Sequence, residues 1–478
     1  MKLRRPLGLA TALLSLASIA LAQKSTLGDS VARRADVCWE TALQIWNLAE
    51  TGYKEERSSA LLAAMLREAG FQVQTGLAEI PTSIVASFGS GRPIIGILGE
   101  YDALPGLSQE AVARPAPIAG KAYGHGCGHH LFGVASASAA IAIAEQIRAG
   151  NLSGTIRFYG TPAEEGGSAK TFMARAGLFN DLDAALHWHP SDRNAAGDPT
   201  NLARIAVKFA FRGRSAHAAG APEQGRSALD AVELTNHAAQ LLREHTPDFT
   251  RIHHVITAGG GAPNVVPDFA EVFYYTRHPD APTVQDIYRR LVLCARGAAM
   301  ATETEVEIEY LGGTYNMLPN DALSRVSLRN LRELNDLSYT AEETAFAREM
   351  QTHLSAPKPL ESIREVHDEI GTMSRGSTDV GDVSWVVPTT GLDVACWVPG
   401  TPAHSWQAVA AGATTIGRKG MLLAARALAA TAWDLFATPE TLAAAKEEHA
   451  GRLRQFSYKA MLEEGQKPPL DYRDPPKE

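Results

Sequence analysis

The chain has 478 residues, of which 45% are hydrophobic and 21% charged, a composition typical of a globular protein long enough for two domains. Its 45 basic and 53 acidic residues give a formal net charge of -8, with no basic run. This balance argues against nucleic acid or an anionic membrane as a partner. Only four cysteines occur, widely scattered, and this excludes a disulfide framework.

Residues 1–22 have the pattern of a secretory signal peptide. Lys2, Arg4 and Arg5 precede an apolar run, and Ala20-Leu21-Ala22 forms a small-x-small cleavage site. The apolar run is too short for a membrane anchor, so we expect cleavage and a periplasmic or secreted protein. Loss of the three basic residues would change the formal charge from -8 to -11. No later stretch is expected to span a bilayer.

Up to residue 200, the hydrophobic pattern alternates between helices and strands. Helical spacing of apolar residues predicts helices over 37–48, 57–69 and 131–147. Apolar runs predict strands over 71–74, 83–88, 93–98, 155–159 and 184–186. This alternation indicates an α/β catalytic domain with a mixed sheet flanked by helices, in which the chemical motifs follow strands.

Between residues 201 and 313 the pattern changes to strand, helix, strand, strand, helix, strand. The expected elements cover 205–211, 227–243, 253–258, 270–277, 284–300 and 303–310. A βαββαβ order predicts a ferredoxin-like α+β module. We therefore divide the mature chain into a catalytic domain of 23–200 and 314–440, interrupted by an inserted domain of 201–313.

After the insertion, the catalytic layer resumes. A buried strand is predicted over 391–398 and one long helix over 408–435. The tail of 441–478 contains a charged amphipathic helix and ends in proline pairs, so we expect a solvated surface element without a functional role. Cys38, Cys294 and Cys396 lie in apolar surroundings and are expected to be buried.

The fourth cysteine, Cys127, lies in a loop of glycines and histidines over residues 124–130. In this loop Cys127 and His129 are two residues apart, and the glycines allow a tight bend. A thiolate and an imidazole can then face one cation. Alone, the loop is a moderate signal, because a turn that happens to hold such residues is common.

Three other loops carry candidate groups. Glu164-Glu165 follows a predicted strand, and one carboxylate of the pair could bind a metal while the other takes a proton from water. His187 and His189 end another strand, and Pro190 should turn the chain so that only one of them is a ligand. His404 lies in a rigid loop after the last buried strand.

At this point the chain resembles a known family. Six motifs come in order: Gly99-Glu100-Tyr101-Asp102-Ala103-Leu104-Pro105-Gly106, the Gly-His-Gly-Cys-Gly-His loop, Pro-Ala-Glu-Glu-Gly-Gly, the histidine after residues 184–186, Ala216-His217-Ala218-Ala219 and Asn264-Val265-Val266-Pro267. They resemble the aminoacylase/carboxypeptidase metallopeptidase family, in the branch of indole-acetyl-amino-acid, hippurate and aminobenzoyl-glutamate hydrolases. Ser377–Asp382 and Gly400–Trp406 look most like the aminobenzoyl-glutamate hydrolase B-subunit group.

The resemblance implies a role for each matching residue. Five residues would hold two divalent metals, zinc or manganese: Cys127, as a candidate bridge, His129, Glu165, His189 and His404. Glu164 would be the general base and then acid, and Asp102 would hold a ligand imidazole. His217, on a dimerisation or lid domain, would reach the active site of a partner subunit, and Asn264 would bind a substrate carboxylate. Arg277 is a weaker candidate for the same task.

Two positions depart from the family pattern. His130 stands where this branch often has aspartate, which leaves the ligand set open. Glu100 stands where other branches have a metal-binding histidine, and this fits a branch that uses cysteine instead.

The sequence therefore predicts an exported, homodimeric, two-metal amidohydrolase that cleaves N-acyl amino acids or small dipeptides. The alternatives are a dipeptidase or carboxypeptidase and a non-catalytic subunit of a hetero-oligomer.

Overall fold

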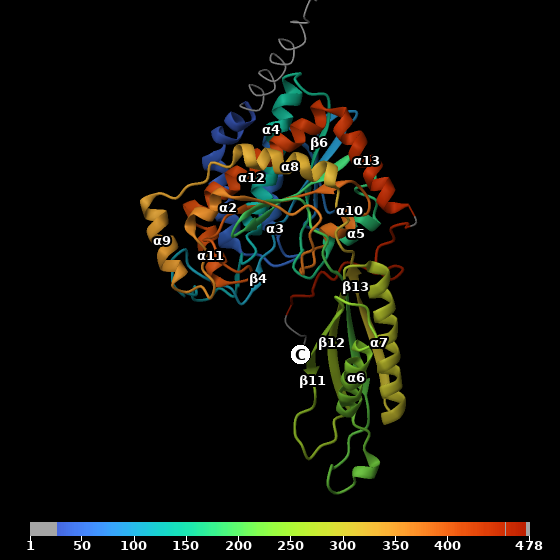
Figure 1. Cartoon of the computed structure of the whole chain (residues 1–478). Coiled ribbons are helices and arrows are strands. Elements are labelled where there is room, and N and C mark those ends of the chain that lie inside the picture. The colour runs from blue at the N-terminus through green and yellow to red at the C-terminus, as the bar shows by residue number, and fades with distance from the viewer. Residues whose placement is uncertain (1–25, 455, 475–478) are drawn as a thin grey trace, which may run out of the picture.

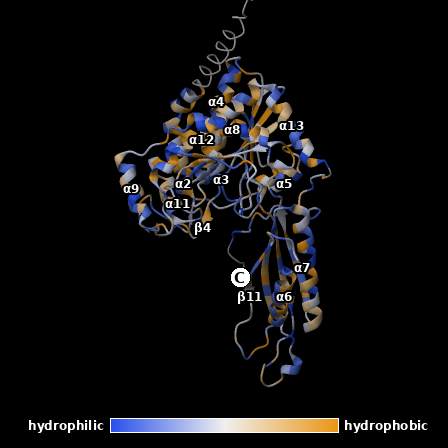
Figure 2. Ribbon diagram, viewed as in Figure 1, coloured by the Kyte–Doolittle hydropathy of each residue, from blue (hydrophilic) through white to orange (hydrophobic). Residues whose placement is uncertain are grey.

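The computed structural model describes residues 26–454 and 456–474, so the signal peptide predicted over 1–22 lies outside the described residues. Figure 1 shows a large helix-covered domain with a smaller, elongated domain projecting from it. In Figure 2, apolar residues gather inside the large domain around α4 (His129–Arg148) and α12 (Thr415–Ala437). The predicted α/β class with an inserted α+β module is confirmed.

The large domain is built on a six-stranded sheet with the order β1-β2-β6-β3-β7-β15. Its strands, in that order, are Gln72–Thr75, Ile84–Ser90, Gly154–Gly160, Ile94–Gly99, Ala184–Leu186 and Thr389–Thr390. β3 runs parallel to β6 and β7, and β15 runs parallel to β7. β2 runs antiparallel to both of its neighbours, β1 and β6. The carboxyl ends of parallel strands meet at one edge of a sheet, so the loops after β3, β6 and β7 come together there.

The helices α4 and α12 form the interior of this domain. α4 is buried along almost its whole length, because its alanine- and serine-rich surface packs closely against β3, β6 and α12. The outer helices are α2 (Ala35–Leu48), α3 (Glu56–Glu68), α8 (Asp321–Leu334), α9 (Ala341–Gln351) and α13 (Pro439–Leu453). Contrary to our prediction, α4 and α12 are each long and apolar enough to cross a membrane. Their most apolar stretches are, however, 89% and 72% buried inside the protein.

Shorter elements complete the edge where the loops meet. A second sheet has the order β14-β9-β16-β8, formed by Val366–Asp368, Asn194–Ala196, Leu392–Ala395 and His189–Ser191. Near it lie the hairpin of β4 (Leu104–Pro105) with β5 (Tyr123–Gly124) and the helices α5 (Ala169–Arg175), α10 (Val380–Ser384) and α11 (Trp406–Gly412). The strand predicted over 391–398 is therefore shorter than expected.

The projecting domain, here called the lid domain, has the predicted βαββαβ order. Its elements are β10 (Ala203–Arg212), α6 (Ala228–Arg243), β11 (Arg251–Ala258), β12 (Phe269–His278), α7 (Ala281–Thr302) and β13 (Glu305–Thr314). The antiparallel sheet has the order β11-β12-β10-β13, and α6 and α7 pack on one face over Phe209, Phe211 and Tyr274. β11 forms one edge of this sheet, and Val255 and Ile256 on it are exposed.

Three predictions about the later part of the chain were wrong. The helix expected over 408–435 is two helices, because Thr414 caps α12 by accepting a hydrogen bond from the N–H of Ile416. Cys294 is half-exposed rather than buried. The tail contains the expected charged helix, α13, but it is not only a solvated surface element: α13 buries Leu442 and Ala445, and the segment after it returns to the root of the lid domain, where Met461 accepts hydrogen bonds from β13.

A glycine fixes the close approach of α12 to β16. A Cβ atom at Gly420 would lie 2.5 Å from both the Ala395 carbonyl oxygen and the Cys396 sulfur. We expect Gly420→Ala to lower the free energy of unfolding by about 1–3 kcal/mol, because the packed helix must shift. The control is Gly297→Ala in α7, where the added methyl meets no atom within 4 Å and should stabilise by about 0.5–1 kcal/mol. Denaturant unfolding measures both changes; equal effects would contradict this account.

Candidate metal centre

The loop after β5 delivers Cys127 and His129 to the centre of the molecule. It turns at Gly128, whose φ of +75° suits glycine, and a Cβ there would lie 2.7 Å from Pro190. Helix α4 begins at His129, so this imidazole is fixed by a helix that is buried along almost its whole length. Cys127 and His129 are both buried.

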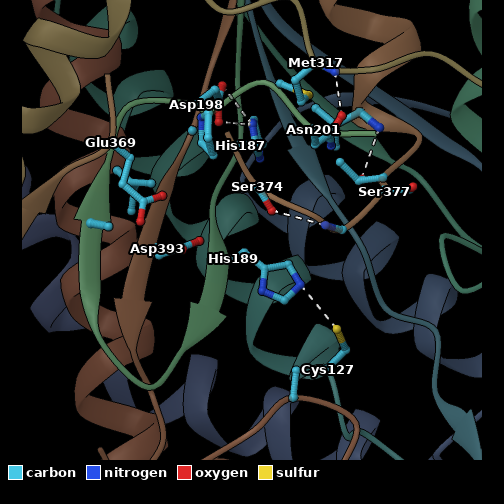
Figure 3. A pocket seen from close by; sticks show the side chains of 18 of the residues that line it. Cys127, His187, His189, Asp198, Asn201, Met317, Glu369, Ser374, Ser377 and Asp393 are labelled. Carbon is cyan, nitrogen blue, oxygen red and sulfur yellow. Dashed lines mark hydrogen bonds and ion pairs between the residues drawn. The ribbon is translucent and has the colours of Figure 1, made fainter. Parts of the chain in front are cut away.

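Two groups of side chains share Cys127. Its sulfur, His129 and His189 form one group, and the same sulfur with Glu165 and His404 forms the other; in each, the ligand atoms lie within 4.8 Å of one another. Figure 3 shows the His189 ring turned toward Cys127, with 3.3 Å between Nε2 and Sγ. One thiolate can therefore belong to two adjacent metal positions.

Hydrogen bonds fix how the imidazoles are turned. Asp102 lies 2.8 Å from Nδ1 of His129, and the Pro190 carbonyl lies 2.7 Å from Nδ1 of His189. Each contact holds the proton on Nδ1 and leaves Nε2 free to bind a metal. Asp102 also accepts a hydrogen bond from the backbone N–H of Glu165, so it connects the two loops.

Strained backbone surrounds the centre. Ala163, Ser168 and His404 have φ values of 53°, 56° and 57°, which residues other than glycine rarely adopt. Such positions cost on the order of 1–3 kcal/mol each and persist where the surroundings hold them. The N–H of His404 donates to the Gly126 carbonyl at 2.8 Å, which ties the last loop to the Cys127 loop.

Glu164 and Glu165 face different sides, as their adjacency suggested. Glu165 lies 3.1 Å from Nε2 of His404, whereas Glu164 groups with Glu100 and His129. Burial, followed by the nearby carboxylates Glu100 and Glu165, raises the pKa of Glu164 well above its usual value. A carboxyl group with a raised pKa is suited to proton transfer near neutral pH.

A fully buried lysine offsets part of this negative charge. Lys170, on α5, lies 2.6 Å from Asp379 and 2.7 Å from Glu100. Burial alone would lower its pKa, but the carboxylates of Asp379, Glu100 and Glu164 raise the pKa of Lys170. The ammonium group therefore stays charged and holds α5 against the loops after β3 and before α10.

The donor set fits divalent cations. Burial and the charge of Glu165 raise the pKa of the Cys127 thiol well above its usual value, so a thiolate here needs a cation beside it. Burial lowers the pKa of His189 to about 3, which keeps this imidazole neutral, as a metal ligand must be. His129 Nε2 lies 3.1 Å from Glu100 and Glu165 Oε1 lies 3.1 Å from His404, and both atoms lie within 4.8 Å of the shared sulfur, where a cation can bind them together.

A cavity of about 530 Å³ opens over these groups. Cys127 and His189 lie at one end in Figure 3, and Asp198, Glu369 and Asp393 lie farther along the same cavity. Burial raises the pKa of Asp393 to about 7, with the Glu369 carboxylate adding to the effect. The cavity thus has room for a small substrate beside the metal positions.

Two histidines whose role as metal ligands the sequence did not decide, His187 and His130, do not face Cys127. His187 is held by Asp198, 3.1 Å from its Nε2, so of the pair only His189 reaches Cys127. His130 lies with its Nε2 3.1 Å from the Gly412 carbonyl and does not join either group of ligands.

The structure does not bring His217 or Asn264 to the centre of the same chain. Both are exposed, on loops that lie side by side through a bridge between His217 and Val265. These loops, between β10 and α6 and between β11 and β12, lie at the lid-domain tip far from the large domain (Figure 1). Arg277 is nearer: it lines a second cavity of about 400 Å³ that also reaches Glu164, Glu165 and His404.

Comparison with known proteins shows the family to which the chain belongs. The model of peptidase family M20/M25/M40 matches residues 96–408, which include all five proposed ligands. The chain belongs to this family. It is therefore a metal-dependent hydrolase of C–N bonds, an amidohydrolase.

Individual members of the M20 family match over most of the chain. The B subunit of p-aminobenzoyl-glutamate hydrolase from Escherichia coli (strain K12) is 41% identical over 86% of this chain and 91% of its own. Xaa-Arg dipeptidase of Homo sapiens is 30% identical over 87% of this chain and 89% of its own. A crystal structure from Bacillus subtilis, described as a dinuclear metal-binding peptidase of family M20, shares the fold at a TM-score of 0.57, with 17% identity over 84% of this chain and 99% of that one.

Sequence reasoning missed several residues of this M20 site. Glu100 was treated only as a replaced ligand, although it lies 3.1 Å from Nε2 of His129. Asp379 lies within the Ser377–Asp382 motif, which could have identified it. Lys170 and Arg473 carry no local signal, because only the fold brings α5 and the tail to the centre.

Loss of the buried lysine should destabilise this M20 enzyme strongly. Lys170→Met leaves Glu100 and Asp379 buried without their cation, so we expect a loss of roughly 3–5 kcal/mol in the free energy of unfolding. The matched control is Lys358→Met, which removes an exposed lysine from Asp192 and should cost at most about 1 kcal/mol. Chemical denaturation of the metal-free variants measures both. Similar losses for the two variants would disprove the role given to Lys170.

Proposed function

We propose that this chain hydrolyses N-acyl or N-aroyl amino acids of the aminobenzoyl-glutamate type, using two divalent ions, zinc or manganese. The observation that carries the proposal is the pair of ligand groups sharing Cys127, with Glu164 beside them and not needed as a ligand of either. The dinuclear description of the Bacillus subtilis structure supports the metal count, and the name of the Escherichia coli relative supports the substrate. A thiolate with imidazoles favours zinc, whereas the carboxylates also suit manganese.

In this proposal the ions supply Lewis-acid activation of water and of the scissile carbonyl. The chain supplies the proton transfer. The Glu164 carboxylate accepts a proton from water as the water oxygen bonds to the carbonyl carbon, and then passes this proton to the amine nitrogen. The amide C–N bond breaks, and an acid and an amine are released. Asp102 keeps His129 in place throughout, through the 2.8 Å contact at Nδ1.

A dipeptidase is the second candidate. The human relative is named an Xaa-Arg dipeptidase, and the cavity wall near Asp198, Glu369 and Asp393 is acidic, which suits a cationic group. A panel of aroyl amino acids and of dipeptides with basic residues, given to the metal-loaded enzyme, decides between the two. Faster cleavage of the dipeptides would replace the first proposal by the second.

We also propose that the site is completed by a second copy of the chain. His217 and Asn264 are exposed at the tip of the lid domain, and β11 leaves an exposed sheet edge on which two lid domains could pair. A histidine donor from the partner would stabilise the charge that develops on the carbonyl oxygen, and Asn264 would bind the substrate carboxylate. The Escherichia coli relative is named a subunit, so a pairing with a different chain is the competing outcome.

The leader pattern of residues 1–22 supports the further proposal that the enzyme is exported.

Two substitutions should separate metal binding from proton transfer. Cys127→Ala removes the shared ligand, so metal content and activity should fall together. Glu164→Gln should keep much of the metal but lower kcat by about 10²–10⁴-fold, the usual contribution of a general acid–base group. Elemental analysis and steady-state kinetics on the same preparations measure this. Unchanged metal in the first variant, or near wild-type turnover in the second, would refute the assignments.

Subunit sharing predicts complementation. His217→Ala should lower turnover by about 10²–10³-fold, as loss of an oxyanion donor does. Mixing His217→Ala with Glu164→Gln subunits should restore activity, since one site of each mixed dimer has both groups intact. Activity is measured after subunit exchange has been verified with tagged chains. A fully active His217→Ala monomer, or no recovery in verified mixed dimers, would end the idea.

A further inference from the structure

The C-terminal segment 456–474 reaches the metal centre. Tyr472 and Arg473 both donate hydrogen bonds to the backbone carbonyl of Glu165, at 2.9 and 2.6 Å. The Tyr472 ring packs edge-on against Tyr53, 5.8 Å between centroids, so the segment is fixed on the protein. Tyr472 and Arg473 are therefore held against the turn that carries Glu164 and Glu165.

Arg473 lines the second cavity together with Arg204 and Arg277 of the lid sheet. Each of the three has a buried Nε atom without a hydrogen-bond partner. Their other hydrogen bonds go to neutral oxygens: Ser168, Ser377 and the Glu165 carbonyl. No carboxylate pairs with any of them among the ion pairs of the described residues, although Glu164, Glu165 and Asp379 line the same cavity.

Arg204 and Arg277 place two positive charges side by side, an arrangement that an anion between them would stabilise. They are directly opposite each other on the antiparallel strands β10 and β12, where like charges repel. Both guanidinium groups lie over the Tyr275 ring, at 4.8 and 5.5 Å from its centroid. Burial and the charge of Arg204 lower the pKa of Arg277. Three arginines exceed what one carboxylate requires, because a single guanidinium can already bind it at both oxygens.

We infer that Arg473 of the C-terminal segment, with Arg204, binds a second carboxylate on the amino acid that the enzyme releases, and so selects acidic amino acids. The inference rests on the proposed function, in which Asn264 of a partner copy binds the first carboxylate; Arg277, the weaker candidate for that task, lines the same cavity as Arg473. It makes Arg473 a specificity-determining residue and gives the tail a role that its composition does not indicate.

The test compares p-aminobenzoyl-glutamate with p-aminobenzoyl-glutamine, which is similar in size but lacks the second charge. Wild-type enzyme should prefer the glutamate compound. Arg473→Gln should raise KM for it by about 10- to 100-fold, the range for a hydrogen bond to a charged group, with kcat and the glutamine compound little changed. Arg473→Lys should recover part of the loss, because it keeps the charge.

Tyr472→Phe is the matched control. It removes the other hydrogen bond to the Glu165 carbonyl without changing charge, so it should affect both substrates by the same factor. If Arg473→Gln also affects both equally, Arg473 acts only through Glu165 and the inference is wrong. The absence of a wild-type preference for glutamate would overturn it as well.

Calorimetric titration of free glutamate and glutamine distinguishes this inference from the proposed function, because binding needs no turnover. Weaker glutamate binding by Arg473→Gln supports the anion pocket even if wild type cleaves no member of the substrate panel, in which case the proposed function alone fails. Glutamate binding that is equal in wild type and Arg473→Gln, in an enzyme that cleaves the panel, overturns the inference alone.

Discussion

The structure depends on how the fold compensates acidic groups crowded into one buried centre. Glu100 and Asp102 follow β3, Glu164 and Glu165 follow β6, and Cys127 follows β5; the first two and Cys127 are buried, and the Glu164–Glu165 pair is half-buried. Burying so many acids is costly unless cations or hydrogen bonds accompany them. Lys170, on α5, offsets part of the charge of Glu100 and Asp379, and Asp102 is held by His129 and the Glu165 amide. The charge that remains, on the side nearest Cys127, is what divalent ions compensate.

The same constraint explains why the surrounding backbone is strained. Ala163, Ser168 and His404 hold left-handed conformations that cost energy, and each lies beside a proposed ligand or the Glu164–Glu165 turn. The loops are held in these conformations by long-range contacts: Glu55 accepts a hydrogen bond from the Ala163 amide, and Gly126 accepts one from His404. Rigid loops keep the metal positions formed before a substrate arrives.

The site is also divided between domains. The large domain supplies the ligands and the acidic cavity, the lid sheet supplies Arg204 and Arg277, and the C-terminal segment closes the junction with Arg473. The two cavities differ in charge and share Glu164, Glu165 and His404. An amide bond placed at the metal centre would therefore have its acyl part on the acidic side and its carboxylate-bearing part among the arginines. This polarity orients a substrate.

The sequence by itself determined the elements and most of the metal loop. Strong periodicity gave β3, β6, α4 and the order of the lid domain, and the Cys127 loop, Glu164-Glu165, His189 and His404 carried local signals as loops after strands. The tertiary structure decided what local patterns cannot encode. The sequence around Lys170 does not indicate that α5 packs beside Asp379. The composition of the polar tail does not indicate that Tyr472 packs on Tyr53. The break between α11 and α12 depends on a single cap at Thr414, a weak signal within a continuous apolar pattern. Contacts between residues far apart in sequence form only when the sheet assembles. A long intervening chain can bring many different pairs of side chains together at similar cost, so local sequence does not determine which pair meets.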